Sequence, residues 1–182
     1  MSAMGRARTA LLSIVMAAAM AQASVAAPPK VVDPPPPASL EITDVEAWAS
    51  TYLHRDAWML ITHDTEGARF IRPEGATPTA PYMVEADVRT ELFRPVKMGP
   101  GVARSGLARW SIDCASTRYA VLSMTIFAHN NMQGELAKKV SADKTWMTPI
   151  ESQVATISVI CRSGLSGRPP ERPLTASPAS PS

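Results

Sequence analysis

Residues 107–128 read LARWSIDCASTRYAVLSMTIFA, and this stretch decides the fold that the sequence predicts. Over 107–114 apolar and polar side chains alternate, which is typical of a half-buried strand. Small polar residues at 115–117 suit a tight reversal, and β-branched and aromatic residues resume over 118–128. We therefore expect an antiparallel hairpin at the centre of a sheet. The frequent Val, Ile and Thr residues disfavour a helix here.

The residues before this hairpin predict three further strands. Apolar runs at 57–62 and 68–72 are joined by a turn-like stretch at 63–67, and a longer strand spans 82–93. In the long strand one face is apolar, and the other face carries four charged residues: Glu85, Asp87, Arg89 and Glu91. Such a division predicts one face on the core and the charged face in water.

The remaining segments between strands are rich in turn-forming or polar residues. Glycine and proline punctuate 74–81 and 95–106, and polar residues dominate 129–134 and 136–143. We interpret 129–134 as a turn and the other three as connections without regular structure.

A helix is predicted before the first strand. Thr43 and Glu46 form a candidate capping box, in which each side chain satisfies the backbone N–H of the other residue. Apolar residues then recur on one helical face as far as Tyr52. The expected helix runs from Asp44 to about Leu53.

A second helix is predicted near the end of the chain. Thr148 can cap it, Pro149 suits its first position, and Glu151 lies three residues after the cap. The β-branched residues over 154–160 favour a strand instead, but the start signals favour a helix that ends at Gly164. The predicted fold class is therefore α+β: an antiparallel sheet of about five to six strands with a C-terminal helix packed on one face, and a short N-terminal helix.

The ends of the chain carry the signatures of export. Residues 1–23 combine a basic start, a short apolar run and a small-residue cleavage pattern, as in a secretory signal peptide. We expect a Pro-rich linker at 24–43, the folded domain at 44–164 and a disordered tail at 165–182. The protein should be periplasmic or secreted. No apolar run after residue 30 is long enough for a transmembrane segment.

The charge balance does not favour nucleic acid or an anionic membrane as a partner. The whole chain has a net charge of +2, and two of its 18 basic residues, Arg6 and Arg8, lie in the expected signal peptide. The remaining chain carries 16 basic and 16 acidic groups. Such a neutral chain gives no reason to expect nucleic acid or an anionic membrane as partner.

The chain contains two cysteines, Cys114 and Cys161. In the oxidising compartment that the export signal implies, two cysteines most simply form one disulfide. It would join the end of a central strand to the last turn of the terminal helix. The alternative is a redox-active pair, which usually requires a closer Cys-x-x-Cys spacing.

No specific catalytic constellation is present. The three histidines, His54, His63 and His129, lack the close helical spacing of a zinc site, and His63-Asp64 is more typical of a polar turn than of metal ligands. Glu85, Asp87 and Glu91 fit a solvated strand face. Trp58, Trp110 and Trp146 fit packing roles. The alternative is that one of them is exposed and marks a contact surface. The sequence therefore predicts no catalytic site, no metal site and no cofactor.

Several short motifs resemble the surface-adhesin protein E family of bacterial envelope proteins. The resemblance runs from about Trp58 to Cys161 and is carried by these residues: Trp58, the run Phe70-Ile71-Arg72-Pro73-Glu74-Gly75, Asp113-Cys114 with Arg118-Tyr119, Trp146 with Pro149 and Ser152, and Cys161. It implies a mostly antiparallel sheet with a C-terminal helix on one face. The family's named member is an adhesin for host matrix and serum proteins. This chain departs from it in lacking a lipid-attachment cysteine, and only the structural cysteines carry over.

These observations predict an exported envelope module of the binding or adhesion type, without catalytic activity, that recognises a protein partner. One alternative is a periplasmic structural or assembly protein that self-associates through an exposed sheet edge. Another is a small-ligand carrier or an enzyme, which would need a concave pocket with convergent polar groups. The sequence does not predict the oligomeric state.

Overall fold

The computed structural model describes residues 31–98, 101–141 and 143–166, all within one unit of the chain. The expected signal peptide and nearly all of the expected tail lie outside the described residues. The helices and strands follow in the order α1 (Ile42–Tyr52), β1 (Met59–His63), β2 (Gly67–Ile71), the short 3-10 helix η1 (Pro73–Gly75), β3 (Thr77–Ala80), β4 (Met83–Met98), β5 (Gly101–Asp113), β6 (Arg118–His129), β7 (Gln133–Val140) and α2 (Glu151–Leu165).

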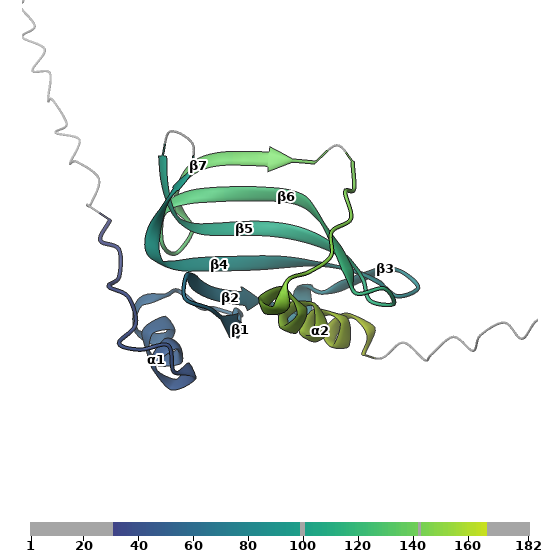
Figure 1. The fold of residues 1–182 in the computed structure, drawn as a ribbon, viewed down its shortest axis with the longest axis horizontal. Helices are drawn as coiled ribbons and strands as arrows, with labels where there is room; N and C mark the ends of the chain where they lie inside the picture. Colours follow the sequence, from purple (N-terminus) through teal and green to yellow (C-terminus); the bar gives the residue numbers. More distant parts are fainter. Residues whose placement is uncertain (1–30, 99–100, 142, 167–182) are drawn as a thin grey trace, which may run out of the picture. The chain divides into compact units, whose positions relative to one another are not determined.

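The strands of the described residues form one antiparallel sheet of seven strands (Figure 1). Its order is β1-β2-β4-β5-β6-β7, and β3 pairs with one end of β4. The predicted fold class is confirmed: an antiparallel sheet, a C-terminal helix on one face and a short N-terminal helix. The sheet has one or two strands more than expected.

The hairpin predicted at 107–128 is the β5–β6 pair. Asp113 pairs with Arg118 and Ile112 with Tyr119, which leaves the expected short reversal between the strands. The Asp113 carboxylate accepts hydrogen bonds from the backbone N–H groups of Ala115 and Ser116 and from the Ser116 hydroxyl. This local network explains why small polar residues follow the strand.

The connection predicted at 95–106 is wrong, because β4 continues to Met98 and β5 already begins at Gly101. Proline usually excludes a central strand because it has no N–H to donate. Here the β4–β5 register shifts between Glu91 and Val96, and Pro95 lies inside that irregular stretch. A local bulge therefore accommodates the proline, and the hairpin extends beyond it.

Two more strands form where connections were predicted. β7 occupies most of 136–143, and β3 occupies part of 74–81. β7 was missed because its sequence, QGELAKKV, is rich in charge rather than in β-branched residues. Charged side chains, lysine above all, are common on edge strands because they discourage unwanted pairing.

Both predicted helices exist, but neither begins with the predicted cap. α1 begins one residue after Glu41, and Ser39 accepts the Glu41 N–H and donates to Asp44 in place of the expected Thr43 box. α2 begins at Glu151, two residues later than the predicted Pro149 start. The Gln153 side chain accepts the N–H of Ile150 at 3.0 Å.

Gly164 does not end α2, which continues to Leu165. The glycine is buried against β4, and a Cβ atom added there would lie 2.5 Å from a methyl carbon of Val84. Its role is therefore close packing of helix on sheet rather than termination. The buried face of α2 accordingly consists of Thr156, Ile157, Ile160 and Gly164, while Val154 is exposed.

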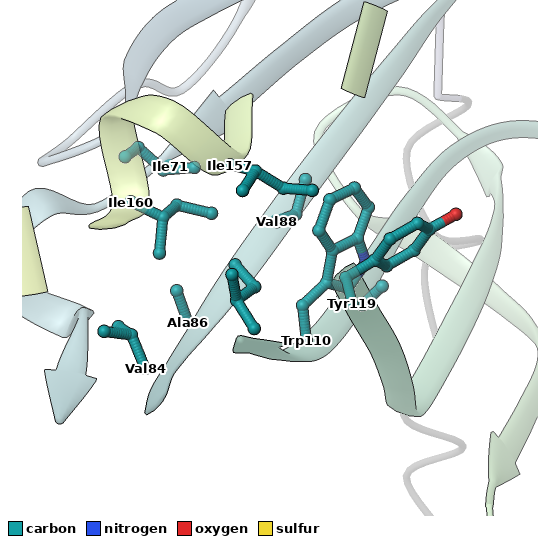
Figure 2. Packing of buried hydrophobic residues seen from close by; sticks show 10 residues of the cluster. Ile71, Val84, Ala86, Val88, Trp110, Tyr119, Ile157 and Ile160 are labelled. Carbon is teal, nitrogen blue, oxygen red and sulfur yellow. The ribbon is translucent and has the colours of Figure 1, made fainter. Parts of the chain in front are cut away.

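One helix packs on each face of the sheet, and each covers a separate apolar cluster. The α2-side cluster has ten residues, shown in Figure 2, of which the last two belong to the helix itself: Ile71, Val84, Ala86, Val88, Ala108, Trp110, Ile112, Tyr119, Ile157 and Ile160. The α1-side cluster has eight others, of which the first three belong to the helix itself: Val45, Trp48, Ala49, Leu53, Trp58, Ala68, Phe70 and Phe93. Alternation explains the division, because Ile71 and Phe70 are neighbours in β2 and point to opposite faces.

A disulfide joins Cys114 to Cys161, with a Cα–Cα distance of 5.8 Å. Cys114 directly follows β5, and Cys161 lies in α2, four residues before the end of that helix. Both half-cystines pack against the α2-side cluster. The crosslink thus fixes α2 on the strand that occupies the middle of the sheet.

Candidate binding surface

Half of the charged face predicted for β4 is not in water. Glu85 and Asp87 lie within 3.6 and 3.4 Å of the Arg109 guanidinium and remain partly exposed. Arg89 and Glu91, however, are 1% and 0% exposed, which corrects the prediction of a solvated face. Alternation alone did not reveal this burial, since α1 and the turn after β6 cover this end of the face.

The buried Arg89 and Glu91 form an ion pair that is satisfied on all sides. The guanidinium lies 2.6 Å from the Glu91 carboxylate and also donates to the carbonyl of His54 and the side chain of Asn131. The other carboxylate oxygen accepts from the Asn130 side chain at 2.9 Å. Burial raises the pKa of Glu91, against the opposing charge of Arg89. The pair joins β4, the end of α1 and the 130–132 turn, and offers no free group to a ligand.

Each of the three histidines bonds to a different part of the structure. The His63 ring bonds the carbonyl of Leu40, the His129 ring bonds Asp33, and His54 contributes its backbone to the buried pair. Within the described ranges, no group of three or more His, Cys, Asp or Glu residues could hold a metal ion. Asp64, beside His63, accepts from the N–H groups of its own turn, as expected of a polar turn.

Part of the Pro-rich segment lies against the domain. The Asp33 carboxylate contacts Arg104, His129 and the N–H of Asn130, and the Trp48 indole donates to the carbonyl of Pro35 at 2.6 Å. The Pro-rich linker predicted at 24–43 therefore contacts the domain at Asp33 and Pro35. These contacts form because the Asp33 carboxylate and the Pro35 carbonyl find hydrogen-bond partners on the domain. The number of prolines in the segment does not indicate such contacts.

The opposite end of the sheet is uncovered. Figure 1 shows both helices near β1, β2 and β4, while β7 forms the far edge. Every β7 residue after Gln133 is exposed, including Leu136 at 43% and Val140 at 70%, and Val102 of β5 is 49% exposed. Among the described strands β7 pairs with β6 only, so its outer backbone groups face solvent. Unpaired strand edges and clustered apolar side chains are features of protein-binding surfaces.

We call this region the β7 surface and define it by Val102, Leu136, Val140 and the free edge of β7. The sequence analysis missed it because it interpreted 95–106, which contains Val102, and 136–143, which contains Leu136 and Val140, as connections. Leu136 and Val140, four residues apart with lysines between them, were the available signal. Trp58 and Trp110 are buried, so neither offers the exposed contact left open for the tryptophans.

The comparisons with known proteins identify the family of this chain. Residues 58–162 match the family described as surface-adhesin protein E, and the chain belongs to that family. No curated protein matches the chain. Membership makes this an adhesion-type protein of the envelope or surface, and it favours a role in binding rather than catalysis. No described helix has the length and apolar character needed to cross a membrane.

Solved structures of Haemophilus influenzae protein E are similar to this chain. One has 16% identity and a TM-score of 0.42, and the match covers 59% of this chain and 85% of that one. A second crystal form has 16% identity and a TM-score of 0.44, with 59% and 88% covered.

Proposed function

We propose that this protein is an exported adhesion-type module, without catalytic activity, that recognises a protein partner through the β7 surface. The observation that carries the proposal is the unpaired edge of β7, a strand on which Leu136 and Val140 are exposed. A partner strand could add to β7 through backbone hydrogen bonds, and the apolar side chains would supply contact area. The family description supports this function.

The location and boundaries belong to the same proposal. The signal peptide pattern supports cleavage near residue 23 and a periplasmic or secreted protein. The expected domain at 44–164 would then be extended at its start by the contacts of Asp33 and Pro35. The mature chain would present β7 on the side of the sheet away from both helices.

Solid-phase binding tests the protein-partner function. The full mature chain is titrated on immobilised extracellular-matrix extract, alongside the variant with both Leu136→Lys and Val140→Lys. We expect saturable binding by the unchanged protein and a loss of at least about tenfold in affinity for the variant, because buried apolar anchors dominate such interfaces. The matched control is Ile150→Lys, which changes another exposed apolar residue, 63% exposed at the start of α2.

Two results would contradict the proposal. Binding that fails to saturate would contradict recognition of a specific protein partner. Equal losses of affinity in the variant and in the Ile150 control would contradict binding through the β7 surface. The same edge also supports the second function, assembly through self-association. Light scattering separates the two, because edge pairing predicts a dimer mass that the lysine variant reduces to that of a monomer.

A further inference from the structure

A groove lies on the α2 side of the sheet, beyond the part that the helix covers. It has a volume of about 280 Å³ and is partly open. Its walls are mostly apolar and come from β4, β5 and β6: Leu92, Met98, Ala103, Trp110, Met124 and Ile126. Gln153, in the first turn of α2, stands at one end. The groove is therefore the part of the sheet face that α2 leaves uncovered, and Val102, Leu136 and Val140 of the β7 surface do not line it.

The inner end of the groove is closed by aromatic rings. Trp110 and Tyr119 have ring centroids 4.6 Å apart, and Figure 2 shows the two rings side by side next to Ile157. At the outer end Met98 and Met124 are 43% and 37% exposed. Gly106 lines the groove between these ends, and a Cβ atom there would meet a single backbone oxygen at 3.6 Å. The missing side chain keeps the groove open.

The two ends differ in charge. At the inner end Arg69, which lines the groove, is neutralised by Asp64 at 2.8 Å. At the outer end Lys139 lies opposite Met124 in the β6–β7 ladder, while Lys97, the neighbour of Met98 in β4, points to the other face. Across the described residues neither lysine forms an ion pair. An anionic group is therefore favoured at the outer end only.

The lining also selects against a peptide. A buried peptide backbone needs hydrogen-bond partners for its N–H and C=O groups, and the apolar walls provide few. A volume near the lower limit of ligand pockets suits a slender molecule. An alkyl chain requires neither polar partners nor width.

We infer that this groove binds a single-chain anionic amphiphile of the fatty-acid class, with its alkyl chain toward Trp110 and its carboxylate toward Lys139. The inference goes beyond the proposed recognition of a protein partner and does not depend on it. Methionines at the mouth suit such a ligand, because their flexible side chains adapt to chains of different length.

Isothermal titration calorimetry with dodecanoate, below its micelle concentration, tests the inference on the full mature chain. We expect one saturable site, a loss of at least about tenfold in affinity for Gly106→Leu, which fills the groove, and a loss of about threefold or more for Lys139→Glu. Dodecanol, which lacks the charge, should bind more weakly than dodecanoate.

Each variant has a matched control on the opposite face. Ser123→Leu adds the same bulk to β6 on the side of Arg109, and Lys138→Glu changes the neighbouring lysine, which pairs with Thr125 rather than Met124. Both controls should bind dodecanoate as the unchanged protein does. Thermal unfolding verifies that the Gly106 variant folds, and Lys139→Glu, at an exposed site, tests the groove independently of that variant.

Three outcomes would overturn the inference. They are no saturable dodecanoate binding, equal losses in variants and controls, or binding to phosphatidylglycerol vesicles without binding to free dodecanoate. The last result would indicate a charged membrane-facing surface instead of a groove for one chain. The solid-phase assay for the β7 surface is unaffected by any of these results, so the two proposals fail separately.

Discussion

The two ends of this sheet have opposite characters. At the β1–β2–β4 end a helix packs on each face, and residues such as Phe70 and Ile71 are fully buried on opposite sides of one strand. At the β7 end no described helix covers the sheet, and Val140 is 70% exposed. The comparison teaches that packing energy is concentrated at one end, so the other end can present apolar side chains to a partner without loss of the fold.

The covered end also contains the ion pair whose disruption should lower the free energy of unfolding most. Replacing Glu91 by Ala removes both oxygens that bind Arg89 and Asn130 and leaves these buried groups without partners, so we expect a loss of about 3–5 kcal/mol in the free energy of unfolding. Urea denaturation measures it. Replacing both residues by methionine should recover much of the loss, and a double variant as unstable as the single one would show that the ion pair itself is not the cause.

Removing the crosslink should weaken the same end by a somewhat smaller amount. Changing both Cys114 and Cys161 to alanine frees a loop with a sequence separation of 47, and we expect a loss of about 2–4 kcal/mol. Denaturation of the variant and of the reduced protein should agree. An unchanged unfolding midpoint would mean that packing alone holds α2 on the sheet.

A single methyl group should disturb the helix–sheet contact more gently. Gly164→Ala places a Cβ atom against Val84, and we expect about 1–3 kcal/mol of destabilisation from overpacking. Adding Val84→Ala should relieve part of it. The control is Gly75→Ala, whose Cβ would meet its nearest neighbour at 3.6 Å, and a similar loss there would refute the packing explanation.

The smallest expected effect is on pH dependence. Burial raises the folded-state pKa of Glu91 above its ordinary value of 4.5, so the folded protein binds this proton more tightly than the unfolded chain does. The carboxyl therefore contributes stability below pH 4.5 that is lost as pH rises through the folded pKa, by at most about 1.4 kcal/mol per pH unit. Thermal melts across this window should show the slope, and Glu91→Gln should abolish it.

The sequence predicted the parts of the fold that depend on local pattern. Alternation located the β5–β6 hairpin, and the two apolar runs before β4 located β1 and β2 within two residues at each end. The helix preferred over the β-branched pattern near the end of the chain is confirmed as α2. The strands were located by their period of two, and α2 by the capping residues near its start.

The missed features depend on tertiary contacts. Arg89 and Glu91 look like a solvated face in one strand, and only the docking of α1 and the Asn130–Asn131 turn makes them buried. Gly164 resembles a helix terminator until Val84 is placed beside it. The β7 surface was hidden because edge strands carry charge, which makes them resemble loops in a sequence.

The disulfide has a mechanical consequence for a protein that works by attachment. Tension applied at the C-terminal end of α2 reaches Cys161 after only four residues of helix and then passes through the covalent bond to Cys114. The load enters the sheet at β5, in its middle, and reaches a partner held at β7 through the β5–β6 and β6–β7 ladders, while most of α2 lies outside the loaded path. A pull from this end would therefore leave α2 folded on the sheet while the sheet itself carries the force.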